Sequence, residues 1–232
     1  MTTQIRLLWQ TQRRCPRTPM WAYMHPRFRY RCHNDSDMDQ FMRTEFPWAY
    51  GAFRCMPLNV MRADMWRYAV MYRYGGVYVD ADSQPIYALR KWVPLATPLF
   101  LLREGTPDHA SYVSQWFFVS LPRNPVFLHA LNETVIRTRR TAGIRVSSEH
   151  FVHHYTGPAM FTDVVARFYD LRRTHTGRGL QTLHGIVSEA PPAALRMEYA
   201  VRRYVLQGSA GSQAGGWKHL RLSQRSTVCR LR

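Results

Sequence analysis

The sequence has few acidic residues, almost no lysine and no long apolar run. Only 15 of its 232 residues are Asp or Glu, against 32 Lys or Arg, which gives a formal net charge of +17. The mean hydropathy is −0.37, and because no run of about 18 apolar residues occurs, we expect no membrane span. The amino terminus also lacks the apolar core of a signal peptide, so we expect neither a leader nor an anchor.

The four cysteines, Cys15, Cys32, Cys55 and Cys229, are widely spaced and form no Cys-x-x-Cys motif. A chain of this length needs no covalent cross-links, so the spacing predicts free thiols in a reducing compartment. With 46% hydrophobic and 13% aromatic residues, the chain can bury a substantial core and is not a disordered protein.

Nearly all of the positive charge is arginine, since Lys91 and Lys218 are the only lysines. A strongly basic chain suits nucleic acid, an anionic membrane or a phosphate-bearing substrate. An arginine excess also accumulates in a GC-rich genome without any selected partner. Composition leaves both interpretations open.

Short apolar runs alternate with helical patterns along the chain. The patterns predict strands at 5–9, 28–32, 77–79, 99–102 and 116–119, and a loop at 16–26. Helices are predicted at 37–46, 59–74, 125–139 and 158–171, the last two with proline in the first turn. This alternation predicts an α/β fold with a mainly parallel sheet.

The densest group of polar residues follows the predicted 59–74 helix. Gly75 and Gly76 end that helix, and Asp80 and Asp82 follow a short apolar strand. Because alternate residues of an extended chain point the same way, the two carboxylates converge. Their repulsion is relieved by a hard divalent cation such as Mg²⁺ or Mn²⁺, although a lone Asp-x-Asp also occurs in ordinary turns. Ligands of open α/β sheets bind at such strand ends.

Asp64 and Arg67 are three residues apart and therefore share one face of the predicted helix. They form either an ordinary surface ion pair or a pair that binds a sugar hydroxyl and a phosphate. The Gly-Gly turn favours the second interpretation, because it returns the chain toward this helix beside Asp80.

The run from Ala63-Asp64-Met-Trp-Arg67-Tyr68 to Tyr74-Gly-Gly-Val-Tyr78-Val-Asp80-Ala-Asp82 resembles the Asp-x-Asp sugar-transferase family. That family includes initiating α-1,6-mannosyltransferases, mannosyl-inositol-phosphoceramide synthases, α-1,4-galactosyltransferases and the core of clostridial glucosylating toxins. Weaker similarities extend in both directions, at Leu8-Trp9-Gln10, His25-Pro26, Thr156-Gly157-Pro158 and Gly216-Trp217.

The resemblance implies a single-domain, Rossmann-like nucleotide-sugar transferase fold of the GT-A type. It implies a catalytic domain over 1–219. The small, flexible residues at 208–217 predict a mobile loop that is either a lid or a plain linker, followed by a basic tail over 220–232. Mn²⁺ or Mg²⁺ would bind Asp80 and Asp82, and the catalytic group would be Asp80, Asp82 and Arg67.

The remaining donor contacts are also implied by the resemblance. Asp64 and Arg67 would hold the donor's hydroxyls and phosphate, Trp9 and Tyr78 would lie by the base, and Trp217 would reach the β-phosphate. The family's usual His-rich stretch before the terminal Trp is absent, which leaves His219 and Ser212 open as a third metal ligand.

The implied reaction moves a hexose from a UDP- or GDP-sugar to a glycan, glycolipid or glycoprotein, with retention of configuration. We expect a cytoplasmic enzyme of bacterial or viral type, without a nucleic-acid partner. The alternative is a basic protein that binds nucleic acid or an anionic surface on an inactive transferase scaffold.

Two other groups of residues have more than one interpretation. His150, His153 and His154 have spacings that suit zinc on a helix, but a loop lining the acceptor cleft is the stronger interpretation. Glu149 is either a base that orients the acceptor or an ordinary surface residue.

Overall fold

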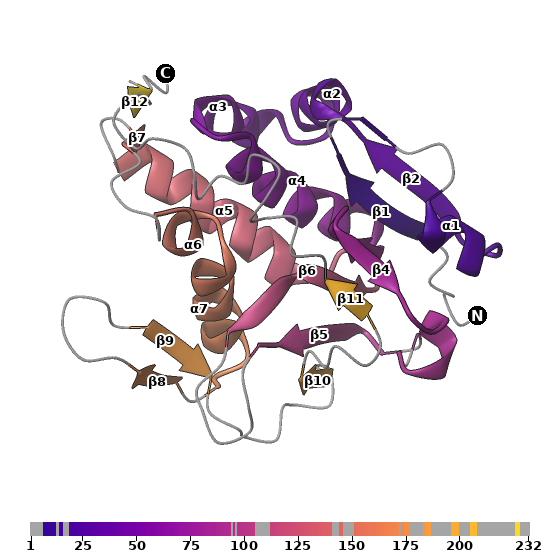
Figure 1. The fold of residues 1–232 in the computed structure, drawn as a ribbon. Helices are drawn as coiled ribbons and strands as arrows, with labels where there is room; N and C mark the ends of the chain where they lie inside the picture. Colours follow the sequence, from indigo (N-terminus) through magenta and orange to yellow (C-terminus); the bar gives the residue numbers. More distant parts are fainter. Residues whose placement is uncertain are drawn as a thin grey trace.

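The computed structural model describes residues 7–12, 14–15, 19–93, 95, 97–104, 112–140, 144–145, 151–171, 173–176, 183–186, 196–199, 205–207 and 226–227. Its centre is a sheet with the strand order β10-β5-β6-β3-β1-β2 (Figure 1). These strands are β1 (Leu7–Thr11), β2 (Arg29–His33), β3 (Gly76–Val79), β5 (Leu99–Arg103), β6 (Val113–Ser120) and β10 (Arg196–Tyr199).

Most pairings in this sheet are parallel, as the sequence predicted. β1 pairs in parallel with β2 and with β3, and β10 pairs in parallel with β5. β6 runs antiparallel between β3 and β5. The α/β class and the mainly parallel sheet are therefore confirmed, with β6 as the reversed strand.

Side-chain alternation divides the core between the two faces of the sheet. Trp9 and Tyr78 belong to one buried cluster, whereas their neighbours Leu8 and Val77 belong to the other. The first cluster is covered by a layer of helices: α2 (Asp35–Glu45), α3 (Pro47–Cys55), α4 (Asn59–Tyr74), α5 (Pro125–Arg140), α6 (Phe151–Tyr155) and α7 (Pro158–Phe168).

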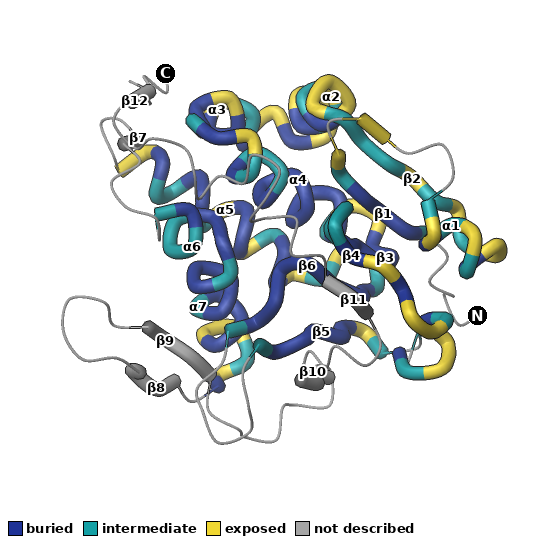
Figure 2. Tube along the Cα trace, in the orientation of Figure 1, coloured by how far each residue is buried: buried dark blue, intermediate teal, exposed yellow. Residues whose placement is uncertain are grey.

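The opposite face is covered by shorter segments. Trp21 of α1 (Met20–Met24) and Leu89 of the 3-10 helix η1 (Leu89–Lys91) pack there beside Val77 and Val79. Figure 2 shows the buried central strands and α4, with exposed stretches on α1 and around η1. The structure thus has a thick helical layer on one face and a thin layer on the other.

Three short antiparallel ladders complete the described structure. They pair β4 (Ser83–Pro85) with β11 (Val205–Gln207), β7 (Ile144–Arg145) with β12 (Ser226–Thr227), and β8 (Arg173–Thr176) with β9 (Leu183–Ile186). Within the described ranges, no helix combines the length and the apolar character needed to cross a bilayer.

The Gly75-Gly76 turn sets the end of α4 and the start of β3. Both glycines have positive φ, +60° and +104°, a conformation that side chains disfavour. A Cβ on Gly76 would lie 2.7 Å from the carbonyl oxygen of Leu7 in β1. Glycine is therefore required where the chain turns from the helix layer into the sheet.

The prediction of a loop over 16–26 is wrong at residues 20–24, where α1 forms because Trp21 anchors it in the core, at 1% exposure. The helix predicted at 37–46 is α2, which ends just before Pro47. α3, which the patterns did not predict, begins at Pro47, since proline fits the first turn of a helix.

The prediction of free thiols is wrong for Cys15 and Cys32, which form a disulfide. None of the cysteines in the described part of the chain is free. The chain leaves β1, passes through α1 and returns as β2 alongside β1, which brings the two Cα atoms to 5.7 Å. Sequence spacing alone does not reveal this return.

Candidate functional site

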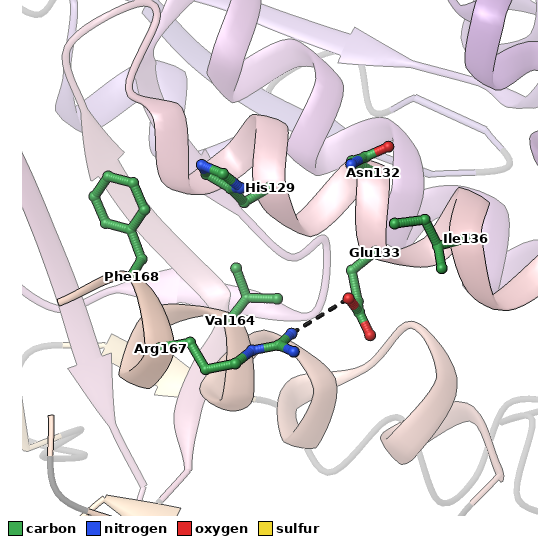
Figure 3. Close-up of a pocket in the computed structure, with 7 residues that line it drawn as sticks. All are labelled: His129, Asn132, Glu133, Ile136, Val164, Arg167 and Phe168. Carbon is green, nitrogen blue, oxygen red and sulfur yellow. Dashed lines mark ion pairs between the residues drawn. The ribbon is translucent and has the colours of Figure 1, made fainter. Parts of the chain in front are cut away.

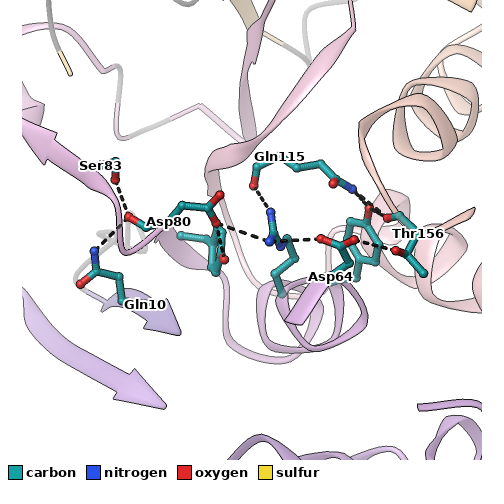
Figure 4. A network of polar contacts seen from close by, with 9 residues as sticks. Gln10, Asp64, Asp80, Ser83, Gln115 and Thr156 are labelled. Atoms are coloured by element: carbon teal, nitrogen blue, oxygen red, sulfur yellow. Dashed lines mark hydrogen bonds and ion pairs between the residues drawn. The ribbon is translucent and has the colours of Figure 1, made fainter. Parts of the chain in front are cut away.

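Asp80 follows β3 directly, and its backbone is held from both sides. Its N–H donates to the carbonyl oxygen of Trp116 in β6 at 2.9 Å. Its own carbonyl oxygen accepts from Gln10 Nε2 at 3.1 Å and from Ser83 Oγ at 2.6 Å (Figure 4). The carboxylate is therefore fixed in place while 29% of the side chain stays exposed.

Arg67 of α4 links the buried part of the site to Asp80. Its Nη2 lies 3.1 Å from Asp64 Oδ1 and 3.4 Å from Asp80 Oδ1, and its Nη1 donates to the Gln115 carbonyl oxygen at 2.7 Å. The guanidinium also lies over the Tyr78 ring, 4.8 Å from its centroid. Burial alone would lower the pKa of Arg67, but the charges of Asp80 and Asp64 raise it above its usual value.

Asp64 lies at the buried end of this network. Only 2% of the residue is exposed, and its Oδ2 accepts a hydrogen bond from Thr156 Oγ1 at 2.6 Å. Burial raises the pKa of Asp64 to about 6, against the lowering effects of Arg67 and Thr156. Thr156 is held in turn, because its carbonyl oxygen accepts from Tyr68 at 2.8 Å and from Gln115 Nε2 at 3.0 Å.

Tyr78 orients the Asp80 carboxylate. Its hydroxyl donates to Asp80 Oδ1 at 2.6 Å, and the tyrosine is fully buried. Burial raises the Tyr78 pKa well above its usual value, so the hydroxyl keeps its proton and remains a donor. Arg67 contacts the same Oδ1, and none of the hydrogen bonds or ion pairs among the described residues uses Oδ2.

Asp82 and Glu104 are two further carboxylates influenced by Asp80. Asp82 is partly buried, and its pKa is raised first by burial and then by the charge of Asp80. Glu104 follows β5, and burial and Asp80 likewise raise its pKa, against the effect of its hydrogen bonds. A bound cation relieves the repulsion between the negative charge of Asp80 and these two carboxylates.

Asp80 and Asp82 fit a divalent ion whose other ligands are water molecules and substrate oxygens. Asp80 and Asp82 supply carboxylate oxygens, but the described residues contain no group of three or more potential protein ligands. Mg²⁺ commonly binds one or two carboxylates together with water and substrate phosphates. The donor set therefore suits an ion that binds together with a phosphate-bearing substrate.

Several predicted site residues lie elsewhere or outside the described ranges. Trp9 is 6% exposed, stacks on Tyr74 and donates from Nε1 to the Gly75 carbonyl oxygen at 2.8 Å. In this position Trp9 packs the core and offers no exposed ring to a base. His153 lies in α6 with its ring 4.6 Å from that of Tyr112. The predictions for the loop 208–217 with Ser212 and Trp217, for His219, Glu149 and His150, and for most of the tail 220–232 concern residues outside the described ranges.

Sequence reasoning missed Gln115, which lies in an irregular part of β6. Leu101 pairs with Phe118 but Arg103 pairs with Val113, so β6 has extra residues between these positions. This irregular stretch carries the Gln115 oxygen that accepts from Arg67 and the Trp116 oxygen that accepts from Asp80. The sequence signal for this residue was the position of Gln115, a polar amide directly before the apolar run 116–119.

A concavity lies between α5 and α7 (Figure 3). It has a volume of about 470 Å³. An ion pair joins the two helices here, with Arg167 Nη2 of α7 at 3.3 Å from Glu133 Oε2 of α5. None of the predicted site residues is among those that line it, which are His129, Asn132, Glu133, Ile136, Val164, Arg167 and Phe168.

Several known proteins are similar to this chain in sequence. Inositol phosphoceramide mannosyltransferase 3 of Schizosaccharomyces pombe is 33% identical over 81 residues, covering 32% of this chain and 23% of that protein. Mannosyl phosphorylinositol ceramide synthase SUR1 of Saccharomyces cerevisiae is 38% identical over 109 residues, covering 47% and 27%. The initiation-specific alpha-1,6-mannosyltransferase of S. pombe is 24% identical over 187 residues, covering 69% and 47%.

The matched segments therefore span less than half the length of each of these relatives. Among solved structures, the PaToxG glycosyltransferase has the same fold, with a TM-score of 0.55 at 15% identity over 72% of this chain and 71% of that one. Residues 13–97 match the family described as "Glycosyltransferase sugar-binding region containing DXD motif". Residues 13–97, which include Asp80-Ala81-Asp82, are thus similar to the sugar-binding region of that family.

Proposed function

We propose that this protein is a metal-dependent glycosyltransferase that moves a hexose from a nucleoside diphosphate sugar to a glycan, lipid or protein acceptor. The observation that carries the proposal is the polar network that joins Asp64, Arg67 and Asp80 behind two accessible carboxylates. The mannosyltransferases among the relatives support a mannose donor such as a GDP-sugar. The resemblance to their family supports retention of configuration.

Asp80 and Asp82 would hold a Mn²⁺ or Mg²⁺ ion together with the donor diphosphate. When bound, such an ion stabilises the negative charge that develops on the leaving diphosphate. In the transfer, the bond between the anomeric carbon and the diphosphate oxygen breaks, and its electron pair stays on the diphosphate. The acceptor hydroxyl oxygen bonds to that carbon and releases its proton to water.

The buried residues would act by holding the Asp80 carboxylate in place. Arg67 is 5% exposed and Asp64 is 2% exposed, so they reach the donor through Asp80 rather than by a broad direct contact. A fixed carboxylate and a fixed positive charge need no rearrangement during the reaction. Electrostatic catalysis is effective because this reorganisation cost is avoided. Tyr78 and Arg67 keep Oδ1 occupied, so that Oδ2 is presented to the ligand.

The test is nucleotide release from a panel of UDP- and GDP-hexoses, with Mn²⁺, with Mg²⁺ and with EDTA. We expect release from at least one donor, dependent on the metal, and a loss of about a hundredfold or more in Asp82→Asn. Direct Mn²⁺ binding, followed by electron paramagnetic resonance, should weaken in the same variant.

Asp170→Asn is the matched control, because Asp170 is exposed and its φ of +52° is tolerated by asparagine. It should leave both measurements unchanged. Metal-independent release, or Mn²⁺ binding that is equal in wild type and Asp82→Asn, would contradict the proposal.

A further inference from the structure

Two short segments present apolar side chains to solvent on the thinly covered side of the sheet. On α1, Met20 is 49% exposed and Tyr23 is 82% exposed. Between β4 and η1, Ile86 is 36% exposed and Tyr87 is 44% exposed. Large side chains of this kind, gathered together on a surface, mark interaction sites more often than chance exposure does.

Hydrogen bonds fix these two segments against each other. Trp21 Nε1 of α1 donates to the Ser83 carbonyl oxygen of β4 at 2.9 Å. The Leu89 N–H at the start of η1 donates to His25 Nε2, just after α1, at 2.9 Å. α1 also contacts β4, and Figure 2 shows the exposed stretches of both segments along one edge of the molecule. The two exposed segments are therefore held against each other in the fold.

The charged residues within these two segments are all positive. Arg27 after α1 and Arg90 and Lys91 in η1 are exposed, and Lys91 lies 5.6 Å from the centre of the Tyr87 ring. No Asp or Glu occurs anywhere in residues 12–33 or 83–103. We call the exposed side chains of residues 20–27 and 86–91 the α1–η1 patch.

We propose that the α1–η1 patch binds the surface of an anionic lipid bilayer. Tyrosine favours the headgroup region of a membrane, and exposed Met and Ile gain from contact with the acyl boundary. The basic side chains are attracted to anionic headgroups within a Debye length. A nucleic acid would use the basic side chains but would leave Met20 and Ile86 without an apolar partner.

The patch is connected to the site described above. Ser83, whose carbonyl oxygen accepts from Trp21, donates from its Oγ to the carbonyl oxygen of Asp80. This proposal goes beyond the transferase proposal, because it is tested by lipid binding alone and does not depend on transferase activity.

The test is co-sedimentation with phosphatidylcholine vesicles, with and without about a quarter of phosphatidylserine, at about 0.1 M and about 0.5 M salt. We expect binding to the anionic vesicles. Arg90→Gln/Lys91→Gln should weaken it by about 25-fold, since each cation near the surface contributes roughly fivefold. Tyr23→Ser/Tyr87→Ser should weaken it by about tenfold and remove most of the binding that persists at high salt.

Matched controls separate the patch from the general positive charge of the protein. Arg139→Gln/Arg140→Gln removes two exposed arginines at the end of α5, and Trp48→Ser removes a 44% exposed aromatic on α3. Both controls should bind vesicles within about twofold of wild type. Thermal unfolding of all four variants checks that each is folded.

Three outcomes would overturn the proposal. Equal loss in patch and control variants would mean that net charge alone binds the vesicles. Equal binding to neutral and anionic vesicles would remove the role of the cations. Binding to a single-stranded oligonucleotide, with no binding to anionic vesicles, would assign the basic surface to nucleic acid.

Discussion

Thr156 and Asp64 are 92 residues apart in the sequence, and the Thr156 hydroxyl donates to the Asp64 carboxylate at 2.6 Å. Both residues are buried. Thr156 lies between α6 and α7, so this contact joins the carboxyl-terminal helices to α4 and thereby to Arg67 and Asp80.

Replacing Thr156 with valine should leave a buried carboxylate without one of its two partners. We expect the free energy of unfolding to fall by about 1–3 kcal/mol, because the remaining group stays desolvated. Thr156→Ser keeps the hydroxyl and should recover most of the loss. Urea unfolding measures the difference, and Thr44→Val on the exposed face of α2 should change stability by less than about 0.5 kcal/mol. Equal effects at the two threonines would show that the Asp64 bond contributes nothing.

Arg67→Lys should destabilise the protein although the charge is kept. A lysine ammonium cannot reproduce the planar set of donors that reaches Asp64, Asp80 and the Gln115 oxygen. Because breaking a buried ion pair typically costs 3–5 kcal/mol, we expect a loss of about 3 kcal/mol by urea unfolding. Arg73→Lys, in the exposed pair with Glu45, should leave stability close to that of wild type. Similar losses in the two variants would contradict this role for Arg67.

Gly76→Ala should be strongly destabilising, because φ is +104° and the new Cβ would meet the Leu7 backbone at 2.7 Å. We expect a loss of at least about 2 kcal/mol, measured by thermal unfolding. Gly51→Ala makes the same chemical change on an exposed position within α3. That control should be neutral or stabilise by about 0.5–1 kcal/mol. A tolerated Gly76→Ala would mean that the turn between α4 and β3 can relax.

His25 should make the protein less stable in mild acid. Burial lowers the pKa of His25 below its usual 6.5, and both ring nitrogens bond to backbone groups. The folded state therefore binds fewer protons than the unfolded state, so the stabilisation is complete above about pH 6.5 and declines as pH falls toward the lower folded pKa. Urea unfolding between about pH 5 and pH 7.5 should give a flatter profile in His25→Gln.

The exposed His129 supplies the control for that profile. His129→Gln should leave the pH dependence as it is in wild type. A His25→Gln profile that keeps the full slope would assign the acid sensitivity to another group, of which the partly buried His33, with its own lowered pKa, is the first to examine.

Local patterns predicted the parts of the fold and site that are contiguous in sequence. The bounds of α4 and the Gly75-Gly76 turn followed from helix periodicity and a glycine stop, and the Asp80–Asp82 motif from its place after an apolar strand. α1 was missed because a five-residue helix has too little periodicity to recognise. It forms because Trp21 is buried, and burial is a property of the whole fold.

The contacts made across the sheet could not be predicted in this way. The Cys15–Cys32 disulfide and the bonds from Gln115 and Thr156 depend on which strands become neighbours. Trp9 shows the converse, because a resemblance in sequence placed it by the donor while the structure uses its ring to pack α4 against β1.

The Cys15–Cys32 bond encloses α1 within a covalent loop. With the bond intact, this loop is tied to β2, and when it is reduced α1 keeps only its non-covalent anchors, including the hydrogen bonds of Trp21 and His25. Thiol reagents in a purification buffer therefore become a variable of the experiment. Preparations made with and without reductant should be compared before any measurement on the amino-terminal third is interpreted.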